Sequence, residues 1–350
     1  MNLDEWQKFA ELDPQDMLAQ IDRLPEMLEE AWQLGLSLPL AQMGEIRSVV
    51  LAGMGGSAIG AELVRGLIVE QCLVPVVVHR DYDLPAWAKG RGTLVVLSSH
   101  SGNTEETLSA FNSALHNQCQ IVTITTGGKL HALAQSSGLP AWKFNHTGQP
   151  RAAVAYSFGL LMALFTRLGL ITDPQAEILS AVVAMKEARQ TLKAENPIHA
   201  NPAKRQAGQM LGRTVTVFGA GHLAAVARRW KGQINEVAKA LANFEEIPEA
   251  DHNAITGIFF PPEECARWMA VFLKSTSDHP RNQMRLDLTR QTLMVEGINT
   301  DIYLASGKSK LEQMWKTLQF GDYTAFYLAM AYEVDPSITP AIDGLKQAMK

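Results

Sequence analysis

The apolar positions of the chain follow two different patterns. Residues 4–34 carry apolar side chains at helical spacing, and Asp13-Pro14 is typical of a helix start. Short runs that are apolar throughout follow, at 47–52, 74–79, 93–97 and 121–125. Helix-like stretches separate them at 58–70 and 104–117. Strands of this kind, alternating with helices, predict a parallel sheet covered on both faces.

A second alternation follows a long helical stretch at 152–195. Its predicted strands are 214–218, 255–260, 268–273 and 301–304, and its last helix-like segments are 311–332 and 339–349. The segments "VVLAGMGGSAIGAELVRGL" and "VTVFGAGHLAAVARRWKGQ" both read as strand, glycine turn and helix, which favours a duplicated α/β domain. We therefore expect a helical segment at 1–35, a first domain at 36–195 and a second domain at 196–350, with Pro197 and Pro202 at the junction.

Composition narrows the class of protein. A chain of 350 residues is long for one hydrophobic core, and its net charge of -5 disfavours nucleic acid as a partner. The three cysteines and nine histidines lack the spacing of a disulfide framework or a zinc site. The sequence contains no apolar run of membrane-spanning length, and its N-terminus is acidic and polar rather than signal-like. We expect a cytoplasmic protein that does not bind membranes.

Two loops in the first half combine glycine with hydroxyl side chains. The loop "SSHSGNTEET" presents Ser99, Ser101 and Thr104 after a buried strand, and the turn "GMGGS" presents Gly55, Gly56 and Ser57. Both would lie at the carboxyl edge of one sheet, where a helix N-terminus favours an anion. Neither loop has the lysine of a P-loop, so one phosphate ester fits better than a triphosphate. The alternative is that the hydroxyls only cap their helices.

The second glycine turn, "VFGAGHLA", matches the dinucleotide fingerprint, which is a weak signal alone. A dinucleotide site also needs an acidic residue after the next strand, about 20 positions on. Glu236 is near that distance, but the stretch around it is helical. The pattern therefore disfavours NAD(P), and His222 reads as a structural turn residue.

The loop "SHSGNTEET" resembles the phosphosugar-binding signature of sugar isomerase (SIS) domains. The further motifs, in chain order, are "GMGGSAIG", "PRAA", "NPAK", "KGQINE", "HN" and "DPSITPAIDGLK". Together they resemble the bifunctional phosphoglucose/phosphomannose isomerase family. The resemblance implies two tandem SIS domains, each a doubly wound, flavodoxin-like parallel sheet flanked by helices, with extra N- and C-terminal helices. It also implies interconversion of glucose or mannose 6-phosphate with fructose 6-phosphate, without a cofactor or a metal.

The resemblance also implies roles for individual residues. Glu236 would be the base that moves a proton between C1 and C2, and Arg151 would stabilise the enediolate. His252 would open the sugar ring with help from Lys346, and Thr339 would lie near C2.

The resemblance further implies a homodimer, because the family's histidine comes from the neighbouring subunit. Pro248 lies between Glu236 and His252, so the two residues cannot share a helix face. His100 and Val237 depart from the family pattern, which leaves the preferred sugar open.

Three other readings stay open at this stage. One is a non-catalytic SIS protein that senses a sugar phosphate, although such regulators carry a basic helix-turn-helix. Another is an amidotransferring SIS enzyme, which would need a nucleophile domain, and this chain has no cysteine before Cys72. The third is a partner-binding module in which the catalytic residues named above are incidental.

Overall fold

The computed structural model describes residues 1–349 and divides into two compact units. The first-sheet unit is Arg23–Val182, and the second-sheet unit combines Met1–Asp22 with Val183–Lys350. Helix α3 (Leu24–Ser37) therefore belongs to the first-sheet unit, and α8 (Gln175–Leu192) spans the boundary between the units. The domain limits expected at 35 and 195 stay a prediction, and Lys350 lies outside the described residues.

The first-sheet unit contains a parallel sheet with the strand order β2-β1-β3-β4-β5. Its strands are β1 (Ser48–Gly53), β2 (Val76–His79), β3 (Thr93–Ser99), β4 (Gln120–Thr125) and β5 (Ala141–Lys143). This is the flavodoxin-like order, and its switch point lies between β1 and β3. Every residue of β3 is buried, as expected for a central strand covered on both faces. The doubly wound fold predicted from the sequence is confirmed.

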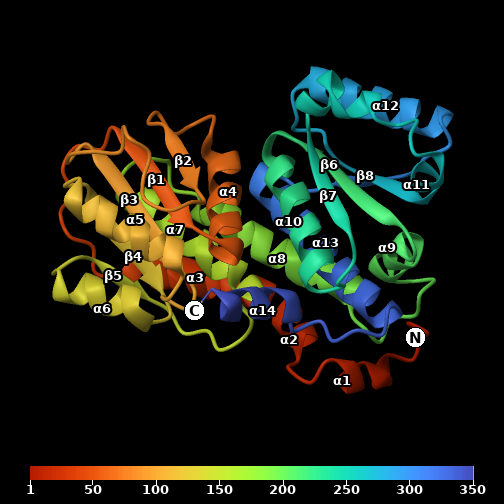
Figure 1. Ribbon diagram of the computed structural model, residues 1–350, viewed down its shortest axis with the longest axis horizontal. Helices are drawn as coiled ribbons and strands as arrows, with labels where there is room; N and C mark the ends of the chain where they lie inside the picture. The colour runs from red at the N-terminus through yellow and green to blue at the C-terminus, as the bar shows by residue number, and fades with distance from the viewer. Residues whose placement is uncertain (350) are drawn as a thin grey trace. The chain divides into compact units, whose positions relative to one another are not determined.

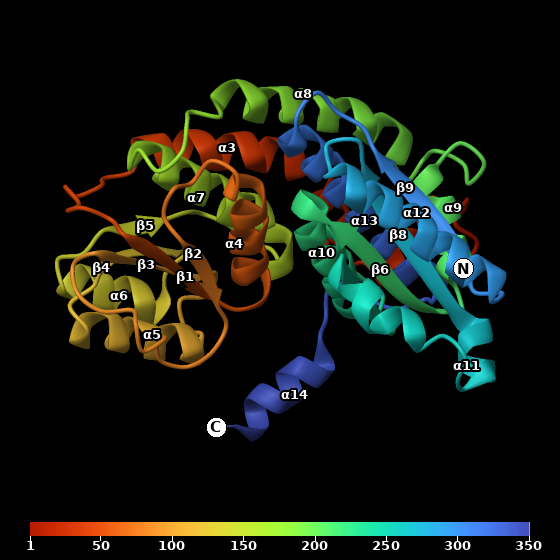
Figure 2. The ribbon, with the colours of Figure 1, turned by 90° about the horizontal axis from the view of Figure 1, so that it is seen from above.

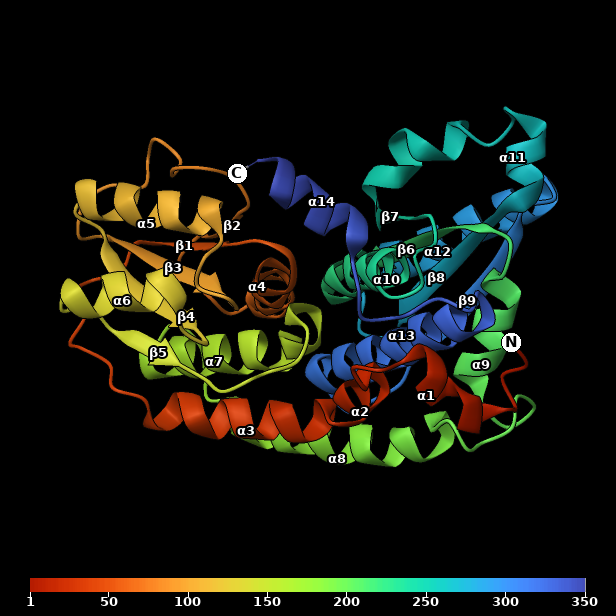
Figure 3. The ribbon, with the colours of Figure 1, turned by 60° about the horizontal axis from the view of Figure 1, so that its bottom comes forward.

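Helices cover both faces of this sheet, as Figure 3 shows. They are α4 (Gly55–Ile68), α5 (Glu105–His116), α6 (Gly128–Ser136) and α7 (Val154–Arg167), together with α3. Helices α5 and α6 pack on one face around a core that includes Phe111, Leu130, Val95 and Leu97. Helices α4 and α7 pack together on the other face, and α3 forms a further layer on α7.

The second-sheet unit repeats this arrangement with the strand order β7-β6-β8-β9, again all parallel; Figure 3 labels these four strands, and Figure 1 labels β6, β7 and β8. Its strands are β6 (Thr214–Ala220), β7 (Ala242–Ile247), β8 (Trp268–Ser275) and β9 (Asn299–Ala305). Its helices are α1 (Phe9–Leu12), α2 (Met17–Asp22), α9 (Pro202–Met210), α10 (Ala224–Glu236), α11 (Pro262–Arg267), α12 (Pro280–Val295), α13 (Lys310–Ala331) and α14 (Pro340–Ala348). Helix α12 packs on one face, and α10 and α13 pack on the other.

The sequence prediction of a strand at 255–260 is wrong. This segment contains a short 3-10 helix, Ala254–Thr256, and then a loop in which Phe259 and Phe260 are exposed. The strand of this part of the sheet is β7, an edge strand whose two ends are buried and whose four middle residues are exposed or half-buried. Its sequence, "ANFEEI", contains three polar residues and so lacks the apolar run that predicted the other strands.

The motif "NPAK" is structural in this fold. Asn201 is the N-cap of α9, and its side-chain oxygen accepts hydrogen bonds from the N–H groups of Ala203 (3.0 Å) and Lys204 (3.2 Å). Its amide nitrogen donates to the carbonyl oxygens of Leu192 and Lys193, both at 3.0 Å. The completely buried Asn201 therefore joins the start of α9 to the end of α8.

Candidate functional site

The turn between β1 and α4 leaves helix N–H groups open at the carboxyl edge of the first sheet. Gly55 has a φ of +50°, a left-handed conformation that favours glycine. A Cβ on Gly56 would lie 2.6 Å from the carbonyl oxygen of Pro150, so only glycine permits this close approach. Ser57 is 7% exposed in the first turn of α4. The glycines thus let the backbone reach a bound group beside the Ser57 hydroxyl.

The loop between β3 and α5 joins two of the predicted hydroxyls. Ser99 Oγ and Thr104 Oγ1 are 2.8 Å apart, and the N–H of Gly102 donates to Ser99 Oγ at 3.1 Å. Thr104 is the N-cap of α5, yet within the described residues its side chain makes no capping hydrogen bond. The reading of this hydroxyl as only a helix cap is therefore wrong.

The loop after β4 packs against the β3–α5 loop and holds it in place through hydrogen bonds. Gly102 has a φ of +68°, and a Cβ there would lie 1.8 Å from the carbonyl oxygen of Gly127. The carbonyl oxygen of His100 accepts hydrogen bonds from the N–H and the hydroxyl of Thr126, at 3.1 and 2.7 Å. Sequence reasoning missed this support. The segment "TTGG" at 125–128, a glycine turn after an apolar strand, was the available signal.

The two hydroxyl loops are neighbours in the sheet, because β1 and β3 pair in parallel with Gly53 opposite Ser98. They therefore meet at the switch point, where open α/β sheets bind ligands. Ser57, Ser99 and Thr104 border this point, while Ser101 is exposed and its Oγ accepts from the N–H of Asn103 at 3.2 Å. The geometry fits an anion held between two helix N-termini.

Arg151 provides a positive charge in the same unit. It lies in the 3-10 helix η2 (Pro150–Ala153) and is only 4% exposed. Its Cα would lie 3.4 Å from a Cβ on Gly56, so Arg151 adjoins the first turn of α4. Its Nη1 donates to Gln149 Oε1 at 3.4 Å. A buried guanidinium beside a helix N-terminus adds to the attraction for an anion.

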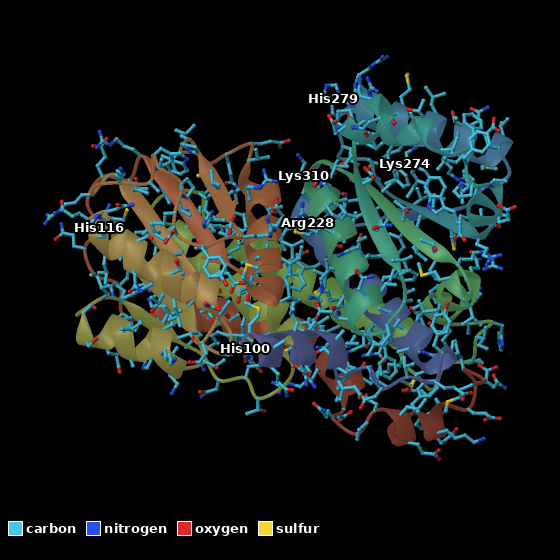
Figure 4. All side chains as sticks on the ribbon, viewed as in Figure 1. His100, His116, Arg228, Lys274, His279 and Lys310 are labelled. Atoms are coloured by element: carbon cyan, nitrogen blue, oxygen red, sulfur yellow. The ribbon has the colours of Figure 1, made fainter. Side chains whose placement is uncertain are left out.

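His100 of the hydroxyl loop pairs with His146. His100 Nε2 and His146 Nδ1 are 3.0 Å apart, and the half-buried His100 is labelled in Figure 4. Burial, and then the charge of a protonated His146, lower the pKa of His100 to about 4. Burial and the charge of Arg23 lower the pKa of His146 as well. At neutral pH both imidazoles are therefore uncharged, and one N–H bridges the pair.

This pair should make the stability of the protein pH-dependent. An unfolded His100 takes up a proton near pH 6.5, whereas the folded one does so near pH 4. The free energy of unfolding should therefore fall as the pH drops through this window. His100→Asn should make the slope shallower in urea titrations between pH 4.5 and 7. The matched variant of the exposed His116 (Figure 4), His116→Asn, should keep the wild-type slope.

The other predicted catalytic residues belong to the second-sheet unit. Glu236 is the last residue of α10 and is half-buried, and the adjacent Val237 is completely buried. His252 is exposed in the 3-10 helix η4 (Glu249–His252), which follows β7. Helix α10 leads back from the carboxyl end of β6 to the amino end of β7. Glu236 and His252 therefore flank opposite ends of β7, whose six residues extend about 20 Å.

The turn that carries His252 is anchored to α12. The neighbouring Asp251 accepts hydrogen bonds from Arg285 Nη1 at 2.9 Å and from Thr289 Oγ1 at 2.6 Å. Asn253 caps the next short helix by accepting from the N–H of Ala254. The imidazole is thus exposed on a fixed turn.

Lys346 and Thr339 lie at the C-terminal end of the chain. Thr339 is the half-buried N-cap of α14, and Lys346 is on α14 itself, whose residues are all exposed. Figure 2 shows α14 extending away from the sheet of its own unit. Lys346 is therefore an exposed side chain on a helix that extends from its unit.

The described residues hold no group of three or more His, Cys, Asp or Glu side chains placed to bind a metal ion. Likewise, none of the helices within residues 1–349 is long and apolar enough to cross a membrane.

Known proteins resemble this chain over most of its length. Residues 199–349 match the model of the bacterial phospho-glucose isomerase C-terminal SIS domain. A bifunctional phosphoglucose/phosphomannose isomerase of Caldicellulosiruptor bescii is 39% identical over 95% of this chain and 98% of its own. The protein of the same name from Aquifex aeolicus is 31% identical over 87% and 91%.

Solved structures agree on the fold. A hypothetical protein from Thermus thermophilus superposes with a TM-score of 0.75 over 99% of this chain and 93% of its own, at 18% identity. A glucose-6-phosphate isomerase like protein from the same organism gives a TM-score of 0.63 over 97% and 98%, at 19% identity.

Proposed function

This chain belongs to the bifunctional phosphoglucose/phosphomannose isomerase family and is a hexose phosphate isomerase, and we propose its substrates and the roles of its site residues. The substrates are glucose 6-phosphate and mannose 6-phosphate, each interconverted with fructose 6-phosphate. The observation that best supports this proposal is the pair of hydroxyl loops at the switch point of a sheet, in a chain 39% identical to a relative of that name.

The phosphate ester binds in the first-sheet unit, between the β1–α4 turn and the β3–α5 loop. Ser57, Ser99, Ser101 and Thr104 supply hydroxyl donors, and the first N–H groups of α4, at Gly55 and Gly56, supply backbone donors. The open left-handed turn at Gly55 and the hydroxyl pair of Ser99 and Thr104 support this assignment. We call these six residues the phosphate cradle.

Removing a cradle hydroxyl should mainly weaken binding. Thr104→Val keeps the size of the side chain but removes its hydroxyl, and a hydrogen bond to a charged group contributes about 1.5–3 kcal/mol. We expect the dissociation constant for fructose 6-phosphate to rise about 10- to 150-fold in calorimetric titrations. Ser136→Ala, which removes an exposed serine hydroxyl from α6, is the control and should bind like wild type. Unchanged binding by Thr104→Val would place the phosphate elsewhere.

The remaining residues perform the proton transfers. Glu236 removes the proton at C1 or C2 and returns it to the other carbon. Arg151, buried and permanently charged, stabilises the enediolate oxygens that form between these steps. His252 and Lys346 open the ring by moving a proton between its end oxygens, and Thr339 contacts the sugar near C2.

The active enzyme is a homodimer in which His252 acts on the substrate of the neighbouring subunit, and it works in the cytoplasm. The topology of the second-sheet unit supports the shared site. Glu236 and His252 flank opposite ends of β7, a strand about 20 Å long, so within that unit they cannot both act on one sugar.

Complementation between inactive variants tests the shared site. Glu236→Gln and His252→Ala subunits, mixed under conditions that allow exchange, should form hybrid dimers. One site of each hybrid contains both an intact Glu236 and an intact His252, so isomerisation should return toward a quarter of the wild-type rate per chain, about what random exchange gives. A wild-type protein that is fully active as a monomer at assay concentration would contradict the shared site.

A further inference from the structure

The glycine turns of the two units follow the same backbone path. The residue before the left-handed glycine has φ −125° and ψ 161° at Met54, and φ −128° and ψ 157° at Ala220. The glycines themselves have φ +50° at Gly55 and +52° at Gly221. The turns can therefore be equated residue by residue. His222 then corresponds to Gly56, and Leu223 corresponds to the cradle residue Ser57.

The loops after the third strand correspond equally well. The glycine two residues before each left-handed glycine lies opposite one residue of the neighbouring strand: Gly53 opposite Ser98, and Gly219 opposite Leu273. The N-caps of the following helices, Thr104 and His279, each lie six residues after that partner. With this register, Lys274 corresponds to Ser99, and Asp278 corresponds to Asn103.

Asp278 directs its carboxylate between the two loops of the second-sheet unit. Its Oδ2 accepts a hydrogen bond from the N–H of Ser275 at 3.2 Å. Its Oδ1 lies 3.6 Å from His222 Nδ1, and a Cβ on Gly221 would lie 3.0 Å from the same oxygen. The carboxylate is completely buried, and the imidazole of His222 is 2% exposed. A negatively charged group of this chain thus fills the space between the glycine turn and the loop.

Asn103, which corresponds to Asp278, leaves the space between the β1–α4 turn and the β3–α5 loop open. The exposed Asn103 turns toward the next loop, where its Oδ1 accepts from the N–H of Lys129 at 3.1 Å. Its Nδ2 donates to the carbonyl oxygen of Ser101 at 3.2 Å. The two units therefore share one backbone framework and differ in what lies between its loops.

We propose that the Asp278 carboxylate is a built-in anion that closes the second unit's counterpart of the phosphate cradle. The chain accordingly binds one phosphorylated sugar, in the first-sheet unit, an inference that rests on the proposed function. A carboxylate takes the place that a phosphate oxygen would take, because the same kind of loop N–H and the same helix N-terminus favour either anion.

Residues around Asp278 also support a closed counterpart of the phosphate cradle. Burial raises the pKa of Asp278 to about 6, while the Ser275 N–H and the charge of Lys310 oppose that rise, so the group is ionised at neutral pH. The cradle hydroxyl of Ser57 is replaced by the apolar Leu223. Lys274, labelled below α12 in Figure 4, directs its ammonium group to both carboxylate oxygens of Asp287, at 2.6 Å. It is therefore already engaged by a carboxylate.

Calorimetric titration with inorganic phosphate and with fructose 6-phosphate tests this proposal. Wild type should bind one molecule of either probe per chain. Asp278→Ala empties the space between the loops, and we expect it to bind a second inorganic phosphate per chain. Glu296→Ala removes an exposed carboxylate of the same unit and should keep a stoichiometry of one. Isomerisation by Asp278→Ala should stay at the wild-type rate.

Wild-type stoichiometry keeps the proposal testable even if Asp278→Ala does not fold. Two sites per wild-type chain, or one site in a folded Asp278→Ala protein, would overturn the closed counterpart while leaving the phosphate cradle intact. A single wild-type site that survives Thr104→Val with full affinity would instead overturn the cradle assignment. If the double variant Ser99→Ala/Thr104→Val binds neither probe, the second-sheet unit has no phosphate site of its own. That result would support both the phosphate cradle and its closed counterpart.

Discussion

Replacing Glu236 by glutamine should abolish most isomerisation while leaving the fold and the phosphate affinity intact. The substitution keeps the size of the side chain and its hydrogen-bonding capacity but removes its basicity. Only the transition state of proton transfer needs that basicity, so kcat should fall by about 10²- to 10⁴-fold. Solvent exchange of the proton at C1 of fructose 6-phosphate should slow in parallel, because exchange requires the same proton abstraction.

The substitution at Glu236 should leave the local structure unchanged. Glu236 ends α10, and the carbonyl oxygen that accepts from Lys239 Nζ at 2.8 Å belongs to its backbone, which the substitution leaves unchanged. Glu296→Gln is the matched control, because Glu296 is an exposed glutamate at the C-cap of α12 in the same unit. Its kcat should equal that of wild type.

Ring opening gives a second way to identify the base. His252→Ala should slow isomerisation of the cyclic substrate, while a substrate supplied in open-chain form should react closer to the wild-type rate. Glu236→Gln should be slow with both forms. A Glu236→Gln enzyme within about threefold of the wild-type kcat would show that another residue is the base, since general-base catalysis contributes far more than that.

The first sheet and its hydroxyl loops could be predicted because their sequence is locally explicit. Val95, Val96 and Leu97 form a run that suits only a strand buried on both faces, and the glycines after β1 are needed for the turn itself. These features depend on neighbours in the sequence. The strand order and the carboxyl-edge position of Ser99 and Thr104 then follow from the rules of parallel sheets.

The features that the sequence did not predict depend on contacts between segments that are distant in the chain. Strand β7 is an edge strand, so its residues Glu245 and Glu246 give no apolar signal, while the apolar Phe259 and Phe260 lie in a loop. The partnership of His100 with His146 joins residues 46 positions apart, and no local pattern indicates it. Asp278 reads as an ordinary loop aspartate until the structure places it beside His222.

Lys204, the last residue of the "NPAK" motif, also makes contacts with distant segments that no local pattern indicates. We expect its replacement to have the largest effect on stability. It is only 1% exposed, and its ammonium group donates to the carbonyl oxygens of Leu3 (2.6 Å) and Ala194 (2.7 Å). It also lies over the rings of Phe9 and Tyr327, at 5.8 and 5.5 Å from their centroids. One buried cation therefore holds the N-terminal segment against α9 and α13.

Lys204→Met should lower the free energy of unfolding by about 3 kcal/mol, because two buried carbonyl oxygens lose a charged donor while the apolar stem is kept. The loss is smaller than two full charged hydrogen bonds, since methionine also removes the cost of burying an ammonium group. Urea titrations measure it, with Lys308→Met, at an exposed lysine of the same unit, as the control. Protease cleavage within residues 1–12 should also accelerate in Lys204→Met, because its anchor at Leu3 is lost. A change below about 0.5 kcal/mol would show that the two carbonyl oxygens find other donors, and that the buried lysine does not fasten this segment.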